Sequence, residues 1–96
     1  MLILITYDVD TTTKAGEKRL RKVAKECVNY GQRVQNSVFE CLLTDAQLVN
    51  LKAILSDIID DSTDSIRFYF LGNNWQRKIE TIGKITSIDP TDTLIV

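Results

Sequence analysis

The chain has 96 residues, 44% of them hydrophobic and 26% charged, with a formal net charge of −1 and no histidine. This length leaves room for one domain over residues 1–96 with a thin core, and the composition excludes intrinsic disorder. The apolar runs are too short for a membrane span and lack signal-peptide features, so we expect a cytoplasmic protein without membrane contact. The lack of histidine excludes a Ser-His-Asp triad, a Cys-His dyad and a histidine zinc site.

The first third of the chain predicts a strand followed by a helix. Residues 2–7 are rich in β-branched and aromatic types and are apolar on both faces, which is typical of a strand. Apolar side chains then recur at helical spacing from Leu20 to Tyr30, with basic residues between them. Gly31 directly after this stretch is a typical helix C-cap.

The middle of the chain predicts a hairpin and the start of a second helix. Residues 33–35 and 37–43 favour two strands joined by a tight turn at Asn36. Thr44 with Gln47 three residues later forms the pattern of a capping box, in which each side chain bonds the other residue's backbone N–H. A helix is therefore expected to begin directly after Thr44.

The last part of the chain predicts the end of that helix and up to three further extended segments. The apolar stripe of the second helix runs to Ile59, and the acidic residues 60–64 are expected to form a solvated loop. Residues 65–71 alternate as a half-buried strand does. A weaker strand is expected over residues 75–82, and a short β-prone tail over residues 93–96.

This order of elements, βαββαβ plus a tail, predicts an α+β fold: a ferredoxin-like sandwich with an extra C-terminal strand. Two helices cover one face of such a sheet, yet the strands over residues 2–7, 37–43 and 65–71 are apolar on both sides. A monomer does not tolerate a large exposed apolar face, so we expect a two-fold homodimer packed through its sheets. A monomer that holds a ligand on this face is the alternative.

The small net charge hides a division into a basic and an acidic segment. From Lys14 to Arg33 seven basic residues stand against two glutamates, which leaves +5, whereas five aspartates stand against one lysine from Asp45 to Asp64. A basic stripe of this kind fits the phosphate backbone of a nucleic acid, and a merely solvated helix face is the alternative. The candidate nucleic-acid-binding residues are Lys18, Arg19, Arg21, Lys22 and Lys25.

Asp8 follows directly on the first strand and is the candidate metal ligand. It shares a strand face with Leu4 and Thr6, so a dimer formed through this face brings two copies of Asp8 together. Two adjacent carboxylates repel unless they share a cation, and oxygen ligands favour Mg²⁺, with Mn²⁺ as a substitute. Such an ion polarises a phosphoryl oxygen and activates water, which is phosphodiester hydrolysis. Asp10 is the alternative or outer-sphere ligand. The competing interpretation is an aspartate that starts a loop.

Several motifs together resemble the small CRISPR-associated endonuclease family, the smaller partner of the CRISPR integrase in spacer acquisition. They are Tyr7-Asp8-Val9 at the end of the first strand, the basic first helix, and the stretch Gly-Gln-Arg-Val-Gln-Asn-Ser-Val-Phe-Glu over residues 31–40. The stretch Leu-Gly-Asn-Asn-Trp over residues 71–75 resembles the type I-C branch of that family. The resemblance covers residues 1 to about 71.

The resemblance implies a homodimer that cleaves nucleic acid with Mg²⁺ and bridges two CRISPR integrase dimers around the duplex to be inserted. It places the metal-binding aspartate on Asp8 and further catalytic residues on Arg33 and Phe39, although core packing is the alternative for Phe39. Family members divide between duplex DNA and single-stranded RNA as substrate. The basic stripe suits either substrate, because phosphate contacts carry no sequence information. Duplex DNA is favoured here, because the sheet lacks an aromatic RNA-binding signature and its open side is expected to form the dimer.

Two other functions stay open on the sequence alone. The first is a DNA-bridging scaffold dimer whose catalytic site is dispensable, in which the basic stripe carries the role. The second is a ferredoxin-like ligand-sensing domain with no nucleic-acid partner. The cleavage hypothesis depends on Asp8, and the scaffold hypothesis depends on the basic residues of the first helix.

Overall fold

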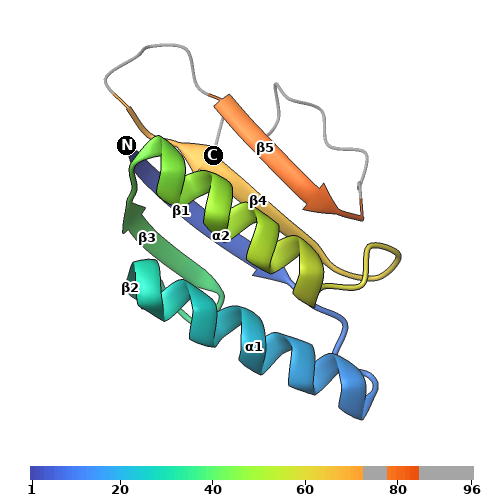
Figure 1. Ribbon diagram of the computed structural model, residues 1–96. Helices are drawn as coiled ribbons and strands as arrows, with labels where there is room; N and C mark the ends of the chain where they lie inside the picture. Colours follow the sequence, from blue (N-terminus) through green and yellow to red (C-terminus); the bar gives the residue numbers. More distant parts are fainter. Residues whose placement is uncertain (73–77, 85–96) are drawn as a thin grey trace.

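The computed structural model describes residues 1–72 and 78–84, and in this part of the chain two helices pack on one face of a five-stranded antiparallel sheet (Figure 1). The elements in chain order are β1 (Leu2–Asp8), α1 (Lys14–Tyr30), β2 (Gly31–Gln35), β3 (Val38–Leu42), α2 (Asp45–Ile58), β4 (Ser65–Phe70) and β5 (Lys78–Gly83). The strand order across the sheet is β2-β3-β1-β4-β5, so β1 lies at its centre.

The predicted sequence of elements is confirmed over most of its length. The strands expected at residues 2–7, 33–35, 37–43 and 65–71 are present with ends shifted by at most two residues. The weak strand expected over residues 75–82 is present as β5. Residues 73–77 and the tail at 93–96 lie outside the described residues. Neither helix in the described part of the chain combines the length and the hydropathy that crossing a membrane requires.

The C-terminus of α1 and the N-terminus of α2 lie where the sequence predicts them. Thr13 caps α1 by accepting a hydrogen bond from the Gly16 N–H, and Thr44 with Gln47 forms the full capping box of α2. Gly31 is the C-cap of α1, but its backbone is extended and leads straight into β2. A side chain there would collide with the Cys41 sulfur, so close approach explains this glycine.

The core lies between the helices and the face of the sheet that they cover. Ile3 and Ile5 of β1, Phe39 of β3 and Phe68 of β4 point to this side and are fully buried. Val23 and Cys27 of α1 and the leucines of α2 close the core from above; the buried leucines are Leu48, Leu51 and Leu55. The alternation of side chains in the strands and the spacing of apolar residues in the helices therefore place these residues in the same core layer.

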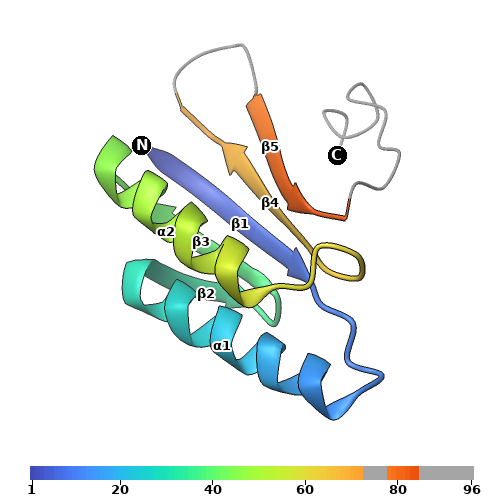
Figure 2. The ribbon, with the colours of Figure 1, turned by 45° about the vertical axis from the view of Figure 1, so that its right-hand side comes forward.

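The second face of the sheet is not covered by any described helix, as Figure 2 shows from the side. On β1 this face carries Leu4, Thr6 and Asp8, whose neighbours Ile3, Ile5 and Tyr7 are buried on the other side. Leu42 of β3 is 76% exposed there, beside Leu2 in the β1–β3 ladder. We call this surface, with its apolar strand residues and Asp8 at one end, the open face.

Candidate functional site

Asp8 ends β1 on the open face, with its side chain exposed to solvent. Its partner in the β1–β4 ladder is Ser65, and the preceding pair on the same face is Thr6 with Arg67. Within residues 1–72 and 78–84 the Asp8 carboxylate makes no hydrogen bond or ion pair, so its oxygens are available to a ligand. The alternation of residues 65–71 indicates that Arg67 shares this face, yet sequence reasoning did not single it out.

Asp10 lies in the loop after β1 and is engaged on both its side chain and its backbone. Its Oδ1 accepts a hydrogen bond from the Thr12 N–H at 2.9 Å, and this bond holds the pKa of the Asp10 carboxyl below its usual value. Its own N–H donates to Asp64 Oδ1 at 3.0 Å. The Asp10 carboxylate therefore stabilises the loop, and its role as an alternative ligand stays a prediction.

Asp64 is fully buried, so the prediction of a solvated loop over residues 60–64 is wrong at its last residue. The donors to its carboxylate are the backbone N–H groups of Asp10 and Asp60, the hydroxyl of Thr63 and Nε of Arg19. Burial by itself raises the pKa of Asp64, but these hydrogen bonds, led by that from Arg19, outweigh it and lower the pKa. Asp64 is therefore an ionised, fully bonded structural carboxylate.

The basic residues of α1 divide into two groups. Lys18, Arg21, Lys22 and Lys25 are exposed on the side of the helix away from the core. Arg19 instead turns toward the loops, where its Nε lies 2.8 Å from Asp64 Oδ2 and only 21% of its side chain is exposed. Four of the five predicted nucleic-acid-binding residues thus form one outward surface, which we call the basic stripe, and Arg19 belongs to the Asp64 contacts.

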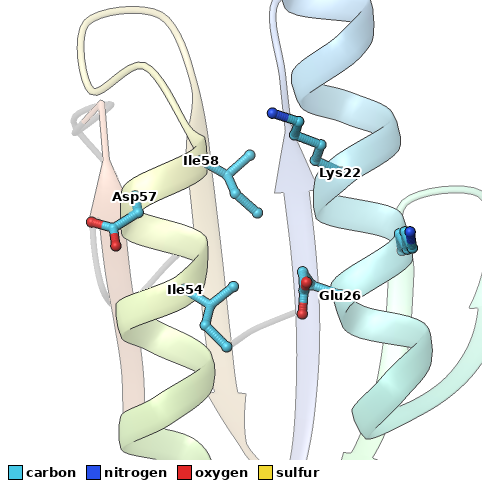
Figure 3. A pocket seen from close by; sticks show the side chains of 6 residues that line it. Lys22, Glu26, Ile54, Asp57 and Ile58 are labelled. Carbon is cyan, nitrogen blue, oxygen red and sulfur yellow. The ribbon is translucent and has the colours of Figure 1, made fainter.

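A groove of about 410 Å³ runs between α1 and α2 beside the basic stripe. Figure 3 shows Ile54 and Ile58 of α2 facing Lys22 and Glu26 of α1 across it. Lys25 and Asp57 complete its lining. Glu26 and Asp57 offset the charges of Lys22 and Lys25 in this groove, so the groove has no strong preference for an anion. The potential for phosphate binding therefore lies on the outward surface of α1.

Arg33 and Phe39 lie together, but not with Asp8. The Arg33 guanidinium stands 5.2 Å from the centroid of the Phe39 ring, which is fully buried and 6.0 Å from the ring of Tyr7. These side chains point to the helix-covered side of the sheet, whereas Asp8 is on the open face. Within one subunit the structure therefore does not bring the three predicted catalytic residues together. Phe39 packs in the core, and Arg33 is exposed above it.

The described part of a single chain does not assemble a cluster of metal ligands. The described residues contain no group of three Asp, Glu, Cys or His side chains that could hold an ion. Burial raises the pKa of Cys27 to about 12 and that of Cys41 to about 11, so both thiols are protonated and poor ligands. The exposed oxygens of Asp8 suit Mg²⁺ by their chemistry, provided that a second subunit supplies further ligands.

Fold and site together define a small α+β protein whose antiparallel sheet presents an exposed carboxylate on one side and whose basic helix lies on the other. Residues 1–79 match the family model described as CRISPR associated protein Cas2. The chain belongs to the Cas2 family.

Two curated relatives are similar in sequence to this protein over nearly the whole chain. A CRISPR-associated endonuclease Cas2 of Halalkalibacterium halodurans is 60% identical over 99% of both chains, and a CRISPR-associated endoribonuclease Cas2 of Chlorobaculum tepidum is 54% identical over 100% of both. The crystal structure of Streptococcus pyogenes Cas2 at pH 6.5 is 67% identical, with a TM-score of 0.72 over 79% of this chain and 92% of that one. The Halalkalibacterium relative is thus named an endonuclease and the Chlorobaculum relative an endoribonuclease, and only the second name specifies RNA.

Proposed function

We propose that this protein is a Mg²⁺-dependent endonuclease that hydrolyses phosphodiester bonds as a homodimer, with duplex DNA as the favoured substrate. The observation that carries the proposal is the Asp8 carboxylate, exposed and unpaired within the described residues at the end of β1 on the open face. When the carboxylate oxygens accept no hydrogen bond from the described residues, they are free to coordinate a cation. The nuclease names of the relatives support the same activity.

The proposed dimer is formed by two ferredoxin-like subunits that pack their open faces together. Leu42 at 76% and Leu2 at 37% exposure leave apolar surface on this face, and a second copy would cover it. Leu2 and Leu42 lie at the end of β1 opposite to Asp8, so the proposed two-fold axis passes through the face beside Asp8. Such an axis would bring the two Asp8 carboxylates into one site, where each would contribute oxygen ligands. Mg²⁺, or Mn²⁺ in its place, would supply charge stabilisation and an activated water there.

The other candidate site residues bind or position the nucleic acid in this proposal. The exposed lysines and Arg21 of the basic stripe contact phosphates, and Arg33 adds a further guanidinium for phosphate or transition-state charge. Phe39 supports Arg33 from the core through its ring. The proposed partners are DNA and two dimers of the CRISPR integrase, in the cytoplasm, during spacer acquisition. The type I-C branch of the family is part of the same proposal.

The proposal is tested by a cleavage assay on duplex DNA and single-stranded RNA of matched sequence, with Mg²⁺, Mn²⁺ or chelator. The wild type is expected to cut duplex DNA with either metal and to stop with chelator. Asp8→Ala is expected to reduce the rate by at least about 100-fold, the scale of losing one electrostatic stabiliser of the transition state, while affinity for DNA persists. Undiminished cleavage by purified Asp8→Ala protein excludes Asp8 as the metal ligand.

A DNA-bridging scaffold without essential cleavage is the second candidate. It is favoured by the separation of the basic stripe from Asp8, since the stripe lies on the helix side and Asp8 on the opposite face. Neutralising Arg21, Lys22 and Lys25 together is then expected to abolish spacer acquisition, whereas Asp8→Ala leaves acquisition intact. The reverse pattern in a cell-based acquisition assay would exclude the scaffold.

A further inference from the structure

The strand end that carries Asp8 is held from two sides by Asp64 and its neighbour. The N–H of Asp10, two residues beyond Asp8, donates to Asp64 Oδ1 at 3.0 Å. Ser65, the residue after Asp64, is the ladder partner of Asp8 itself. A displacement of Asp64 therefore reaches Asp8 both along the chain and across the β1–β4 pairing.

The backbone around Asp64 is closely packed against neighbouring segments of the chain. Gly16 in the first turn of α1 lies against the Asp10 carbonyl, where a side chain would overlap that oxygen. Gly83 at the end of β5 has a positive φ of 89° and lies against the Asp64 carbonyl, which also accepts the Lys84 N–H at 2.6 Å. The end of β5 and the Asp10 loop thus both contact Asp64, and the first turn of α1 packs against the Asp10 loop.

Arg19 completes these contacts from α1. It follows Gly16 by three residues and precedes Val23 by four, so it lies beside the buried face of the helix. Its Nε bonds Asp64 Oδ2 at 2.8 Å, while Lys18 and Lys22 on the same helix are exposed. The guanidinium of Arg19 therefore binds the loop that carries Asp64, and it is not part of the basic stripe.

We infer that the Arg19–Asp64 ion pair is a positioning device for the proposed metal site, which holds the end of β1 so that Asp8 projects from the open face at a defined place. The inference rests on the proposed function and extends it to two residues that touch neither metal nor substrate. Groups that orient metal ligands from outside the coordination sphere change metal affinity or activity by about 10–100-fold when removed. The same range is expected here.

The test compares Asp64→Asn with Asp61→Asn, an exposed aspartate of the same loop. The three readouts are Mn²⁺ affinity by electron paramagnetic resonance, steady-state cleavage of duplex DNA, and amide hydrogen exchange at Asp10. Asp64→Asn is expected to weaken Mn²⁺ binding and to lower kcat by about 10–100-fold, with KM for DNA within about twofold of the wild type. Exchange at the Asp10 amide becomes faster. Asp61→Asn matches the wild type in all three.

A second pair of variants separates positioning from phosphate contact. If Arg19 acts through Asp64, Arg19→Gln lowers kcat and Mn²⁺ affinity, and the double variant with Asp64→Asn is within about twofold of Asp64→Asn alone. If Arg19 contacts phosphate, its loss weakens DNA binding and adds to the Asp64→Asn defect, and the inference is wrong. All assays run below the melting temperature of the least stable variant. If Asp64→Asn does not fold, the Mn²⁺ affinity of Arg19→Gln tests the inference instead. The Arg19 side chain is partly exposed, so its replacement is expected to disturb folding less.

The outcomes distinguish this inference from the proposed function. A wild type that binds Mn²⁺ and cleaves, beside Asp64→Asn and Arg19→Gln proteins that do both equally well, overturns the inference and leaves the function standing. A wild type that neither binds Mn²⁺ nor cleaves overturns the function and the inference with it. Faster exchange at Asp10 with unchanged Mn²⁺ affinity shows that the pair serves stability alone, which also overturns the inference.

Discussion

Two aspartates at the same end of the β1–β4 pair have opposite environments. Asp8 projects into solvent from the open face, whereas Asp64 is 0% exposed and receives hydrogen bonds from four donors. A carboxylate whose oxygens are already bonded stabilises the fold but has little left for a cation. A carboxylate that the fold leaves bare is free to bind one. The contrast teaches that the fold places a buried structural carboxylate directly beside an exposed one, and only the exposed one is proposed to bind a metal.

The largest expected effect is the loss of stability when the buried carboxylate of Asp64 is removed. Asp64→Ala removes the buried partner of the Arg19–Asp64 ion pair and leaves Arg19 and two backbone N–H groups without their acceptor. The free energy of unfolding is expected to fall by about 3 kcal/mol. Asp8→Ala is expected to change it by less than about 0.5 kcal/mol, as an exposed site does. Urea unfolding of both variants measures the difference, and equal losses would contradict the assignment of roles.

The next effect concerns the open face. Leu42→Glu places a charge on the most exposed apolar side chain of this surface within the described residues. A folded monomer tolerates this charge, but a dimer packed through the open face does not. The dimer is expected to weaken by about 1–3 kcal/mol, or roughly 5–150-fold in its dissociation constant. Sedimentation velocity measures the dissociation constant. Val49→Glu on the outer side of α2 is the control, since Val49 is also exposed but lies away from the sheet. Equal dissociation of both variants would argue against dimerisation through this face.

A smaller, graded effect follows from the lowered pKa of Asp64. Because the folded pKa lies below the unfolded value of about 3.9, ionised Asp64 stabilises the protein above about pH 4. This contribution is lost as the pH falls through the folded pKa. Asp10 and Asp60 also have lowered pKa values, from hydrogen bonds with Thr12 and Ser62 respectively. Unfolding curves of Asp64→Asn are therefore expected to depend less on pH below 4 than those of the wild type, and parallel curves would refute this.

The smallest effect is expected far from both aspartates. Lys52 of α2 pairs with Glu80 of β5 and lies over the rings of Phe68 and Phe70. Both charged groups are partly exposed, so Lys52→Met is expected to change the free energy of unfolding by no more than about 1 kcal/mol. It should leave Mn²⁺ binding unchanged. A large loss of Mn²⁺ affinity in this variant would show that the metal site responds to any damage in the fold.

The layered fold and the position of Asp8 are readable from local patterns. The period of two in a strand places Ile3, Ile5 and Tyr7 on the face opposite to Asp8, and the structure confirms that division. Spacing in α1 likewise separates the basic stripe from the core. These predictions succeed because strand and helix geometry alone determine which side chains share a face. The same alternation places Phe39 on the buried side, where core packing is the simpler role.

The Asp64 contacts were not readable in the same way. Asp64 is 45 residues from Arg19 and 54 residues from Asp10 in the sequence. No local pattern therefore predicts that this acidic residue of a polar loop is buried. The spacing of Arg19 with Gly16 and Val23 is a partial signal, because it places this one basic residue beside the buried face. Its partner still depends on tertiary structure. Dimerisation and metal binding depend on a second chain and are open to experiment.

The stoichiometry of Mn²⁺ binding tests the central claim most directly. The account predicts one Mn²⁺ for every two wild-type chains, because each subunit supplies a single Asp8 to a shared site, and no tight binding by Asp8→Ala. Titration followed by electron paramagnetic resonance, with the mass of the protein determined on the same sample, measures the ratio. One Mn²⁺ per chain, or unchanged binding by Asp8→Ala, would contradict a metal site shared between the open faces of two subunits.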